Sequence, residues 1–372
     1  MKKRHKFFAA IIIISMIILS FVMYSNLITA ENFSINFVPE DSNSKDDSFE
    51  NESNNINYEN IRDYENYEKG NLSLYFCPRD DCEFMFLDFI NSAKEEISCA
   101  LFDVGLDSVQ NKLLEKEKEL EGNVKIVTDD NYLHKFDHSF VVSDSWGLMH
   151  HKFCVVDGLK VLTGSMNPTN NGAHKNNNNL IIIKSKLLAQ NYLSEFEKMY
   201  SGKFKKKEGN SNLVNEQIIL EVNKRNITIK NYFCPKDNCA YRIKEELKKA
   251  NKSIHFMTFS FTNDGIANIL LLQQLKGVKV EGVMEARQVS KYSKFQVLKF
   301  QGVNVSKDSN KQNMHHKFFV IDSKTVITGS MNPTGGGDSR NDENVVVIED
   351  EEIAKMYLGE FERLQNRTEF IF

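Results

Sequence analysis

Two stretches of the sequence carry the same set of side chains that could act on a phosphate group. The shared pattern is H-x-K-x4-D-x6-G-S-x-N, and accidental coincidence of two such sets is improbable. The first copy comprises His150, Lys152, Asp157, Gly164, Ser165 and Asn167. The second copy comprises His315, Lys317, Asp322, Gly329, Ser330 and Asn332.

The spacing predicts which of these side chains share a face. Side chains alternate along a strand, so His150 and Lys152 should point to one side, as should Ser165 and Asn167. An ammonium, a hydroxyl and an amide could hold the nonbridging oxygens of a phosphoryl group while the imidazole attacks or transfers a proton. Asp157 lies an odd number of residues from His150 and should face away. We therefore interpret Asp157 and Asp322, with Gly164 and Gly329, as structural parts of the motif.

The elements that position these residues are also written twice. Residues 150–169 match residues 315–334 at 14 of 20 positions, at an offset of 165. Residues 75–82 match 232–239 at an offset of 157, so the second copy has 8 extra residues between the blocks. Each copy alternates apolar strands with amphipathic helices, which predicts an α/β/α sandwich. We expect two α/β halves, residues 71–207 and 208–372, with the lysine-rich stretch 203–207 as the joint.

The N-terminal region differs in composition from the rest of the chain. Four basic residues precede an uncharged apolar run of 17 residues, 7–23, which predicts a membrane anchor or a signal peptide within residues 1–30. Residues 31–70 hold 11 acidic and 3 basic residues, typical of a disordered tether. The remaining residues hold 40 basic and 40 acidic residues, so the body lacks the basic excess usual in nucleic-acid-binding proteins.

The two motifs resemble the HKD signature of the phospholipase D superfamily at every named position, and the resemblance covers essentially residues 71–372. The region from Ile254 to the second motif looks most like the compact bacterial endonuclease and mitochondrial Zucchini-type members, which are dimers with one motif per chain. The resemblance implies two pseudo-twofold-related halves, both motifs in one cleft, a covalent phosphohistidine and no required metal or cofactor. With both motifs in one chain, we expect a monomer.

The resemblance also predicts how the two histidines differ. Family members often carry an acid about a dozen residues after the motif asparagine, where it orients a catalytic histidine. The second half has Glu343 there and the first half has Asn178, an asymmetry similar to that of tyrosyl-DNA phosphodiesterases. We expect Glu343 to raise the pKa of His315, the acid/base, and Asn178 to orient His150, the nucleophile. Alternatively, Asn178 belongs to a loop without a role.

The cysteines divide into repeated and unrepeated positions. Cys77 and Cys82 recur as Cys234 and Cys239, and in an exported body each pair could form a disulfide. A zinc site built from the two pairs is a weaker alternative, because the spacing is loose. The other two, Cys99 and Cys154, fall in apolar strands and are expected to be buried thiols.

These observations favour a phosphodiesterase with a phospholipid substrate, since an anchor would hold the cleft near lipid headgroups. A nuclease is the first alternative, supported by a basic patch of Lys203, Lys205, Lys206 and Lys207 that could contact a nucleic-acid backbone. A phosphatidyltransferase such as a cardiolipin synthase would use the same residues. A binding module without activity is disfavoured, because neither motif has lost a reactive residue.

Overall fold

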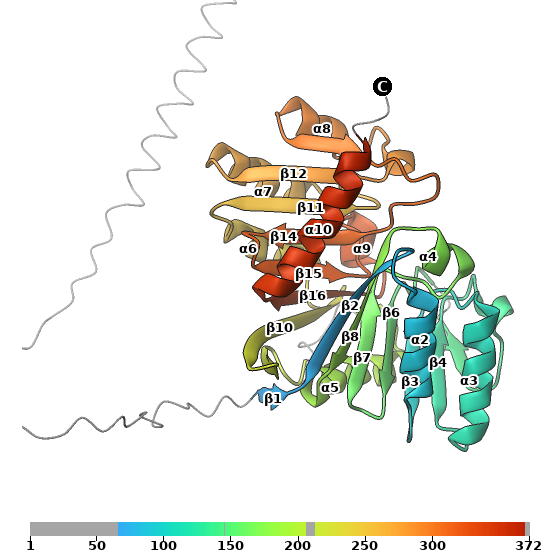
Figure 1. The fold of residues 1–372 in the computed structure, drawn as a ribbon. Coiled ribbons are helices and arrows are strands. Elements are labelled where there is room, and N and C mark those ends of the chain that lie inside the picture. The colour runs from blue at the N-terminus through green and yellow to red at the C-terminus, as the bar shows by residue number, and fades with distance from the viewer. Residues whose placement is uncertain (1–65, 145, 206–212, 369–372) are drawn as a thin grey trace, which may run out of the picture. The chain divides into compact units, whose positions relative to one another are not determined.

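The computed structural model describes residues 66–144, 146–205 and 213–368 (Figure 1). The predicted anchor and most of the predicted tether lie outside these residues. Within the described part of the chain, no helix has the length and apolarity needed to cross a bilayer.

The first half is built on a seven-stranded sheet with the order β2-β8-β7-β6-β3-β4-β5. Its strands are β2 (Asn71–Cys77), β3 (Ile97–Leu101), β4 (Val124–Thr128), β5 (Val141–Ser143), β6 (Lys152–Val156), β7 (Lys160–Gly164) and β8 (Asn178–Lys184). Its helices are α2 (Cys82–Asn91), α3 (Asp107–Glu119), the 3-10 helix η2 (Leu133–Lys135), α4 (Asn170–His174) and α5 (Lys186–Tyr200).

The second half repeats this order in a nine-stranded sheet, β1-β9-β10-β16-β15-β14-β11-β12-β13. Its strands are β1 (Tyr67–Lys69), β9 (Ile218–Val222), β10 (Arg225–Cys234), β11 (Ser253–Thr258), β12 (Lys279–Met284), β13 (Asn304–Lys307), β14 (Lys317–Ile321), β15 (Thr325–Gly329) and β16 (Glu343–Glu349). Its helices are α6 (Cys239–Lys248), α7 (Asp264–Leu275), the 3-10 helix η3 (Ala286–Gln288), α8 (Phe295–Phe300), α9 (Gly335–Ser339) and α10 (Glu351–Thr368).

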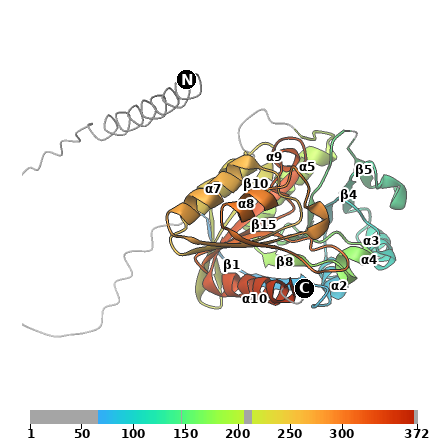
Figure 2. The same cartoon turned by 90° about the horizontal axis from the view of Figure 1, so that it is seen from above.

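Each sheet is covered by helices on both faces, which confirms the α/β fold class. Figure 2 shows α7 and α8 on one face of the second sheet and α10 on the other. The strands that follow the motif histidines, β6 and β14, are buried along their whole length, as continuous apolar runs between helical layers should be. Polar caps define where the inner helices begin: the Ser185 hydroxyl accepts the Leu188 amide at the start of α5.

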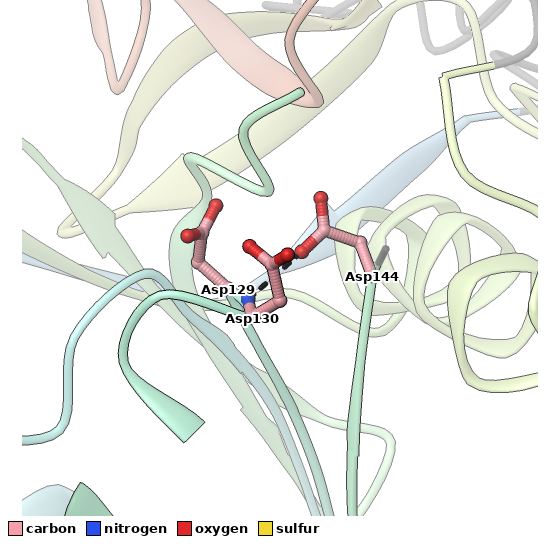
Figure 3. A group of neighbouring side chains, drawn as sticks. All are labelled: Asp129, Asp130 and Asp144. Carbon is pink, nitrogen blue, oxygen red and sulfur yellow. Dashed lines mark hydrogen bonds between the residues drawn. The ribbon is translucent and has the colours of Figure 1, made fainter. Parts of the chain in front are cut away.

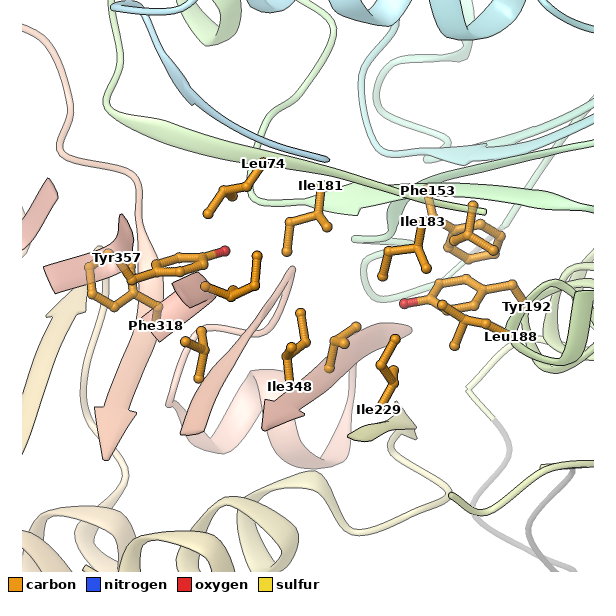
Figure 4. Packing of buried hydrophobic residues seen from close by; sticks show 14 of the residues in the cluster. Leu74, Phe153, Ile181, Ile183, Leu188, Tyr192, Ile229, Phe318, Ile348 and Tyr357 are labelled. Atoms are coloured by element: carbon orange, nitrogen blue, oxygen red, sulfur yellow. The ribbon is translucent and has the colours of Figure 1, made fainter. Parts of the chain in front are cut away.

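A single apolar core joins the two halves. Leu74, Ile181 and Ile183 of the first sheet face Ile229 and Ile348 of the second (Figure 4). The inner helices α5 and α10 add Tyr192 and Tyr357 to the same core, and both rings are fully buried. Burying so much apolar surface between the sheets holds the halves in one arrangement, which fixes the motifs relative to each other.

Two sequence expectations about local structure need correction. The last residues of the predicted tether form β1, which pairs in parallel with β9, so this segment is part of the second sheet. The expected buried thiols Cys99 and Cys154 form a disulfide, because they lie directly opposite each other on β3 and β6.

The structure also joins Cys77 to Cys82 and Cys234 to Cys239 by disulfides. Each of these bridges closes the short turn between the strand that opens a half, β2 or β10, and the helix that follows it. The six cysteines therefore make three disulfides and leave no free thiol.

Candidate active site

The two histidine motifs meet at the junction of the halves. Two short bridges connect the sheets there, one between Met149 and Asp342 and one between Asn177 and Met314. The His150 amide donates to the Asp342 carbonyl at 2.9 Å, and the His315 amide donates to the Asn177 carbonyl at 2.8 Å. Each motif histidine is thus held by the backbone of the opposite half.

His150 is paired with the carboxylate of Glu343, which begins β16 in the second half. The distance from His150 Nδ1 to Glu343 Oε2 is 2.7 Å, and Glu343 is fully buried. The Ser330 hydroxyl donates to the same carboxylate oxygen at 2.7 Å. With Nδ1 donating to this carboxylate, the Nε2 atom of a neutral His150 keeps a free lone pair.

His315 is paired with the amide of Asn178, which begins β8 in the first half. The Nδ1 atom of His315 lies 2.9 Å from Asn178 Oδ1, and the Ser165 hydroxyl donates to that oxygen at 3.0 Å. The expected pairing is therefore wrong: Glu343 orients His150 and Asn178 orients His315. The reason is that each orienting residue forms a hydrogen bond with the motif serine of its own half. The two short β-bridges between the sheets place the histidine of the other half beside that residue.

The motif lysines lie beneath the histidines. Lys152 Nζ donates to the His150 carbonyl at 2.6 Å and Lys317 Nζ to the His315 carbonyl at 2.9 Å. Each ammonium also lies near the ring of a phenylalanine at the end of the neighbouring strand, Phe102 or Phe259. One hydrogen bond per lysine leaves further N–H groups to hold phosphate oxygens.

Burial shifts the ionisation of the whole cluster. Burial lowers the pKa of Lys152 to about 7, although the negative charge of Glu343 opposes the shift. The pKa of Lys317 is lowered well below its ordinary value, again chiefly by burial. Burial raises the pKa of Glu343 to about 7. Such shifts are typical of catalytic groups that must exchange protons near neutral pH.

The site without substrate favours the neutral form of both histidines. Burial, and then the charges of Lys152 and Lys317, lower the pKa of His150 well below its ordinary value. Burial, followed by the charges of the same lysines, has this effect on the pKa of His315. The expected rise in the pKa of His315 is therefore contradicted, and burial is the main reason.

The motif glycines allow a close approach between neighbouring strands. Gly164 has a φ of 141°, and a Cβ there would lie 2.3 Å from the Asn179 carbonyl oxygen. At Gly329, with a φ of 137°, a Cβ would lie 2.2 Å from the Asn344 carbonyl oxygen. Only glycine fits both conditions, and the motif serine that follows is thereby placed against its orienting residue.

The motif aspartates lie away from the site, as expected for structural residues. The Asp157 carboxylate accepts the amides of Lys94, Glu95 and Glu96, at distances of 2.8 to 3.1 Å. Asp322 accepts the three corresponding amides in the second half. These carboxylates fix the turn that leads into β3 or β11, the strand next to the motif histidine.

The start of β8 makes a connection between the halves that the sequence did not predict. Asn179 Nδ2 donates across the interface to Tyr357 at 2.9 Å, and Asn344 donates to Tyr192 at 3.1 Å. The sequence did contain a signal for this contact, because Asn179 and Asn344 are identical residues at the offset of 165. The motif asparagines Asn167 and Asn332 each have a buried side-chain oxygen without a hydrogen-bond partner in the described structure.

Acidic side chains of the first half hold the segment that enters the motif. Asp129, Asp130 and Asp144 have carboxylate oxygens within 4.8 Å of one another (Figure 3), a set that could bind a metal ion by its chemistry. Asp129 accepts the Met149 amide at 2.9 Å, one residue before His150. The ammonium of Lys205 contacts Asp144, so a cation of the chain already pairs with one carboxylate of this cluster.

This contact corrects the predicted basic patch. The Lys205 side chain is 3% exposed and pairs internally, so it does not face a nucleic acid. Lys203 is exposed, and Lys206 and Lys207 lie outside the described residues. The patch therefore gives less support to a nuclease than the sequence indicated.

Comparison with known proteins identifies relatives in both sequence and structure. The family described as "Cardiolipin synthase, PLD-like domain" matches residues 86–200 and 243–365. A phospholipase D of Rickettsia typhi is 36% identical over 141 residues, which is 38% of this chain and 68% of that protein. The human mitochondrial cardiolipin hydrolase is 32% identical over 135 residues, 35% of this chain and 54% of that protein.

A solved structure resembles both halves together. The phosphatidylserine synthase of Haemophilus influenzae covers 79% of this chain and 85% of its own, with a TM-score of 0.58 and 12% sequence identity. This likeness shows the fold.

Proposed function

The chain belongs to the phospholipase D superfamily and is a phosphodiesterase, and from this premise we propose that it hydrolyses phospholipids through a phosphohistidine on His150. One observation carries the assignment of roles: the carboxylate of Glu343 pairs with His150, and the amide of Asn178 pairs with His315. When Nε2 of His150 bonds to phosphorus while Nδ1 keeps its proton, the ring becomes positive. A carboxylate stabilises that charge and an amide does not.

The chemistry follows in two displacements. The negative charge of the bound phosphodiester favours protonation of His315. In the first displacement, Nε2 of His150 attacks phosphorus, the bond to the leaving oxygen breaks, and protonated His315 gives its Nε2 proton to that oxygen. In the second, neutral His315 takes a proton from water, the water oxygen bonds to phosphorus, and the bond to His150 breaks. Lys152, Lys317 and the motif asparagines hold the nonbridging oxygens, which supplies positive charge without requiring a metal ion.

A phospholipid is the favoured substrate for two reasons. First, the chain is similar in sequence to proteins named phospholipase D and mitochondrial cardiolipin hydrolase. Second, Lys205 is buried in an ion pair, which removes part of the basic patch that favoured a nuclease. An anchor within residues 1–30 would keep the body at a membrane surface, outside the cytoplasm. A nuclease and a phosphatidyltransferase use the same residues and are the alternative outcomes of the test.

The test compares substrates and histidine variants of the full-length protein. Vesicles of phosphatidylcholine or cardiolipin, and single- and double-stranded DNA, are incubated with the protein in EDTA, and released headgroup or cut DNA is measured. We expect lipid hydrolysis that persists in EDTA and falls on the order of 10³-fold or more in His150→Ala and in His315→Ala. His134→Ala, at an exposed histidine, is the control. DNA cleavage without lipid hydrolysis would replace the proposed substrate.

A further inference from the structure

A cavity of about 550 Å³ is lined by residues of both halves. Asn178 directs its side chain to His315, whereas the preceding residue, Asn177, bonds the Asn310 amide on the other side, as alternation along the chain requires. We call this cavity the rear pocket. It is lined by Pro78, Arg79, Lys175, Asn177, Asp308, Ser309, Asn310, Lys311, Arg363 and Leu364.

Basic side chains outnumber acidic ones in the lining of the rear pocket. Four of its lining residues are basic and one, Asp308, is acidic. Burial raises the pKa of Asp308, which weakens its repulsion of an anion. Arg79 pairs with Asp80 at 3.1 Å, and both Arg79 and Arg363 approach Glu360, at 3.6 and 2.6 Å. Lys175 and Lys311 are exposed at the rim. The pocket therefore offers two flexible ammonium groups to a ligand, and its two guanidinium groups can contact that ligand through the N–H groups that their carboxylates do not occupy.

The pseudo-twofold counterpart of this pocket is filled by the chain itself. In the first half, the Lys205 amide donates to Asp342 at 2.8 Å, where in the rear pocket Asn310 donates to Asn177 at 2.6 Å. The ammonium of Lys205 then contacts Asp144, the counterpart of Asp308. The second half has no such plug in its described residues, because α10 continues as a helix to Thr368.

The counterpart pocket, which Lys205 fills, and the rear pocket differ in charge, and this difference favours one class of ligand. The filled pocket has Asp130 and Asp342 where the rear pocket has Ala286 and Asn177, as their matching backbone contacts show. Two acids that accompany an ammonium in the first half are thus replaced by neutral residues in the second. This exchange disfavours an amine ligand in the rear pocket and favours an anion.

We propose that the rear pocket binds a phosphate dianion, either free phosphate or a phosphomonoester. Arginine forks match phosphate oxygens in pairs, and the volume suits a small molecule. A dianion gains more from this pocket than the singly charged diester that the catalytic site would take. The phosphomonoester source rests on the proposed function, because hydrolysis of a phosphodiester produces one.

The rear pocket also connects to the catalytic site. Arg363 bonds Glu360, whose carboxylate lies 3.1 Å from Nε2 of His316, the residue next to His315. An anion would compete with Glu360 for Arg363 and Arg79. Binding of an anion in the pocket can therefore change the position of His316 and of the backbone of His315 next to it.

The experiment counts phosphate sites on the full-length protein by equilibrium dialysis with radiolabelled inorganic phosphate. We expect two phosphates per wild-type chain, one catalytic and one in the rear pocket, and one per Lys175→Gln/Lys311→Gln chain. The matched control, Lys203→Gln/Lys279→Gln, removes two exposed lysines elsewhere and should keep two. One phosphate in the wild type, or two in the Lys175→Gln/Lys311→Gln variant, would overturn the proposal.

Two further measurements separate the ligand and the proposals. If glycerol 3-phosphate displaces the radiolabelled phosphate from the rear pocket, the ligand is a phosphomonoester, and if it does not, the ligand is free phosphate. Dimethyl phosphate, a singly charged diester, should displace the radiolabelled phosphate at least tenfold less well than unlabelled phosphate does. Lipid hydrolysis should be unchanged in Lys175→Gln/Lys311→Gln without added phosphate. A wild type that binds two phosphates but hydrolyses no phospholipid would refute the proposed substrate and leave the rear pocket assignment standing.

Discussion

Glu343 in the second half of the chain lies 2.7 Å from Nδ1 of His150 in the first half. Asn178 of the first half makes the reciprocal contact with His315. The two histidines therefore share similar burial and the same pair of lysines, and they differ in whether the orienting residue carries a charge. This difference decides the expected behaviour of each.

The covalent intermediate should form on His150. A carboxylate at Nδ1 stabilises the positive ring that results when Nε2 bonds to phosphorus. Quenching a reaction without acid and mapping phosphopeptides should place phosphate on His150. The adduct on His315 would exchange the two roles and leave the reaction class intact.

Loss of the proton donor should depend on the leaving group. In His315→Ala, p-nitrophenyl esters should retain far more activity than esters of alkyl alcohols, because p-nitrophenolate departs without a proton. Rates for the two ester types in His315→Ala and His150→Ala provide the comparison. Equal losses for both esters in His315→Ala would contradict the assignment of His315 as the acid.

The dependence of kcat/KM on pH should be bell-shaped, with a maximum near neutrality. As pH falls through the pKa of Glu343, about 7, the carboxylate gains a proton and stops stabilising the positive ring of His150. As pH rises through the pKa of Lys152, also about 7, a positive charge facing the phosphate is lost. Because these groups interact, the measured values belong to the pair.

Glu343→Gln should change both limbs of that profile. The acidic limb should disappear with the carboxyl group, and the alkaline limb should move to lower pH, because the charge of Glu343 raises the pKa of Lys152. The maximal rate should fall on the order of 10²-fold. An unchanged acidic limb would show that another group controls it.

Asn178→Asp should increase the protonated fraction of His315. Burial and the charges of the lysines lower the pKa of His315, and a carboxylate at this position would raise it, so esters of alkyl alcohols should react up to about tenfold faster at neutral pH while p-nitrophenyl esters change little. Asn171→Asp, at an exposed position in α4, is the charge-matched control. Thermal unfolding of both variants checks that the buried aspartate leaves the fold intact, and a uniform loss for both esters would refute the prediction.

The Cys99–Cys154 disulfide should contribute more stability than the Cys77–Cys82 disulfide. The first spans a sequence separation of 55 and the second a separation of 5, and loop entropy predicts about 4 kcal/mol against about 2 kcal/mol. The free energies of unfolding of Cys99→Ala/Cys154→Ala and Cys77→Ala/Cys82→Ala in urea test the order. The reverse order would show that local packing outweighs loop length.

The sequence predicted the fold and the motif residues that meet at the junction of the halves, because both are encoded locally. Alternation places His150 beside Lys152, and the repeat identifies a second copy of every motif residue. The predicted partner of Glu343 was wrong. The true partner depends on how the two halves pack, and residue spacing along the chain does not contain that information. Cys99 and Cys154 were missed for the same reason, since their contact depends on strand register.

The exchange of orienting residues explains what a fused chain gains over two identical chains. In a symmetric pair of single-motif subunits, both histidines must have the same partner, so either can serve as either group. Here one substitution, at Asn178 or at Glu343, alters the histidine of the opposite half and leaves the other pairing intact. Duplication within one chain thus permits the two histidines to keep different roles, because each half supplies the residue that orients the histidine of the other.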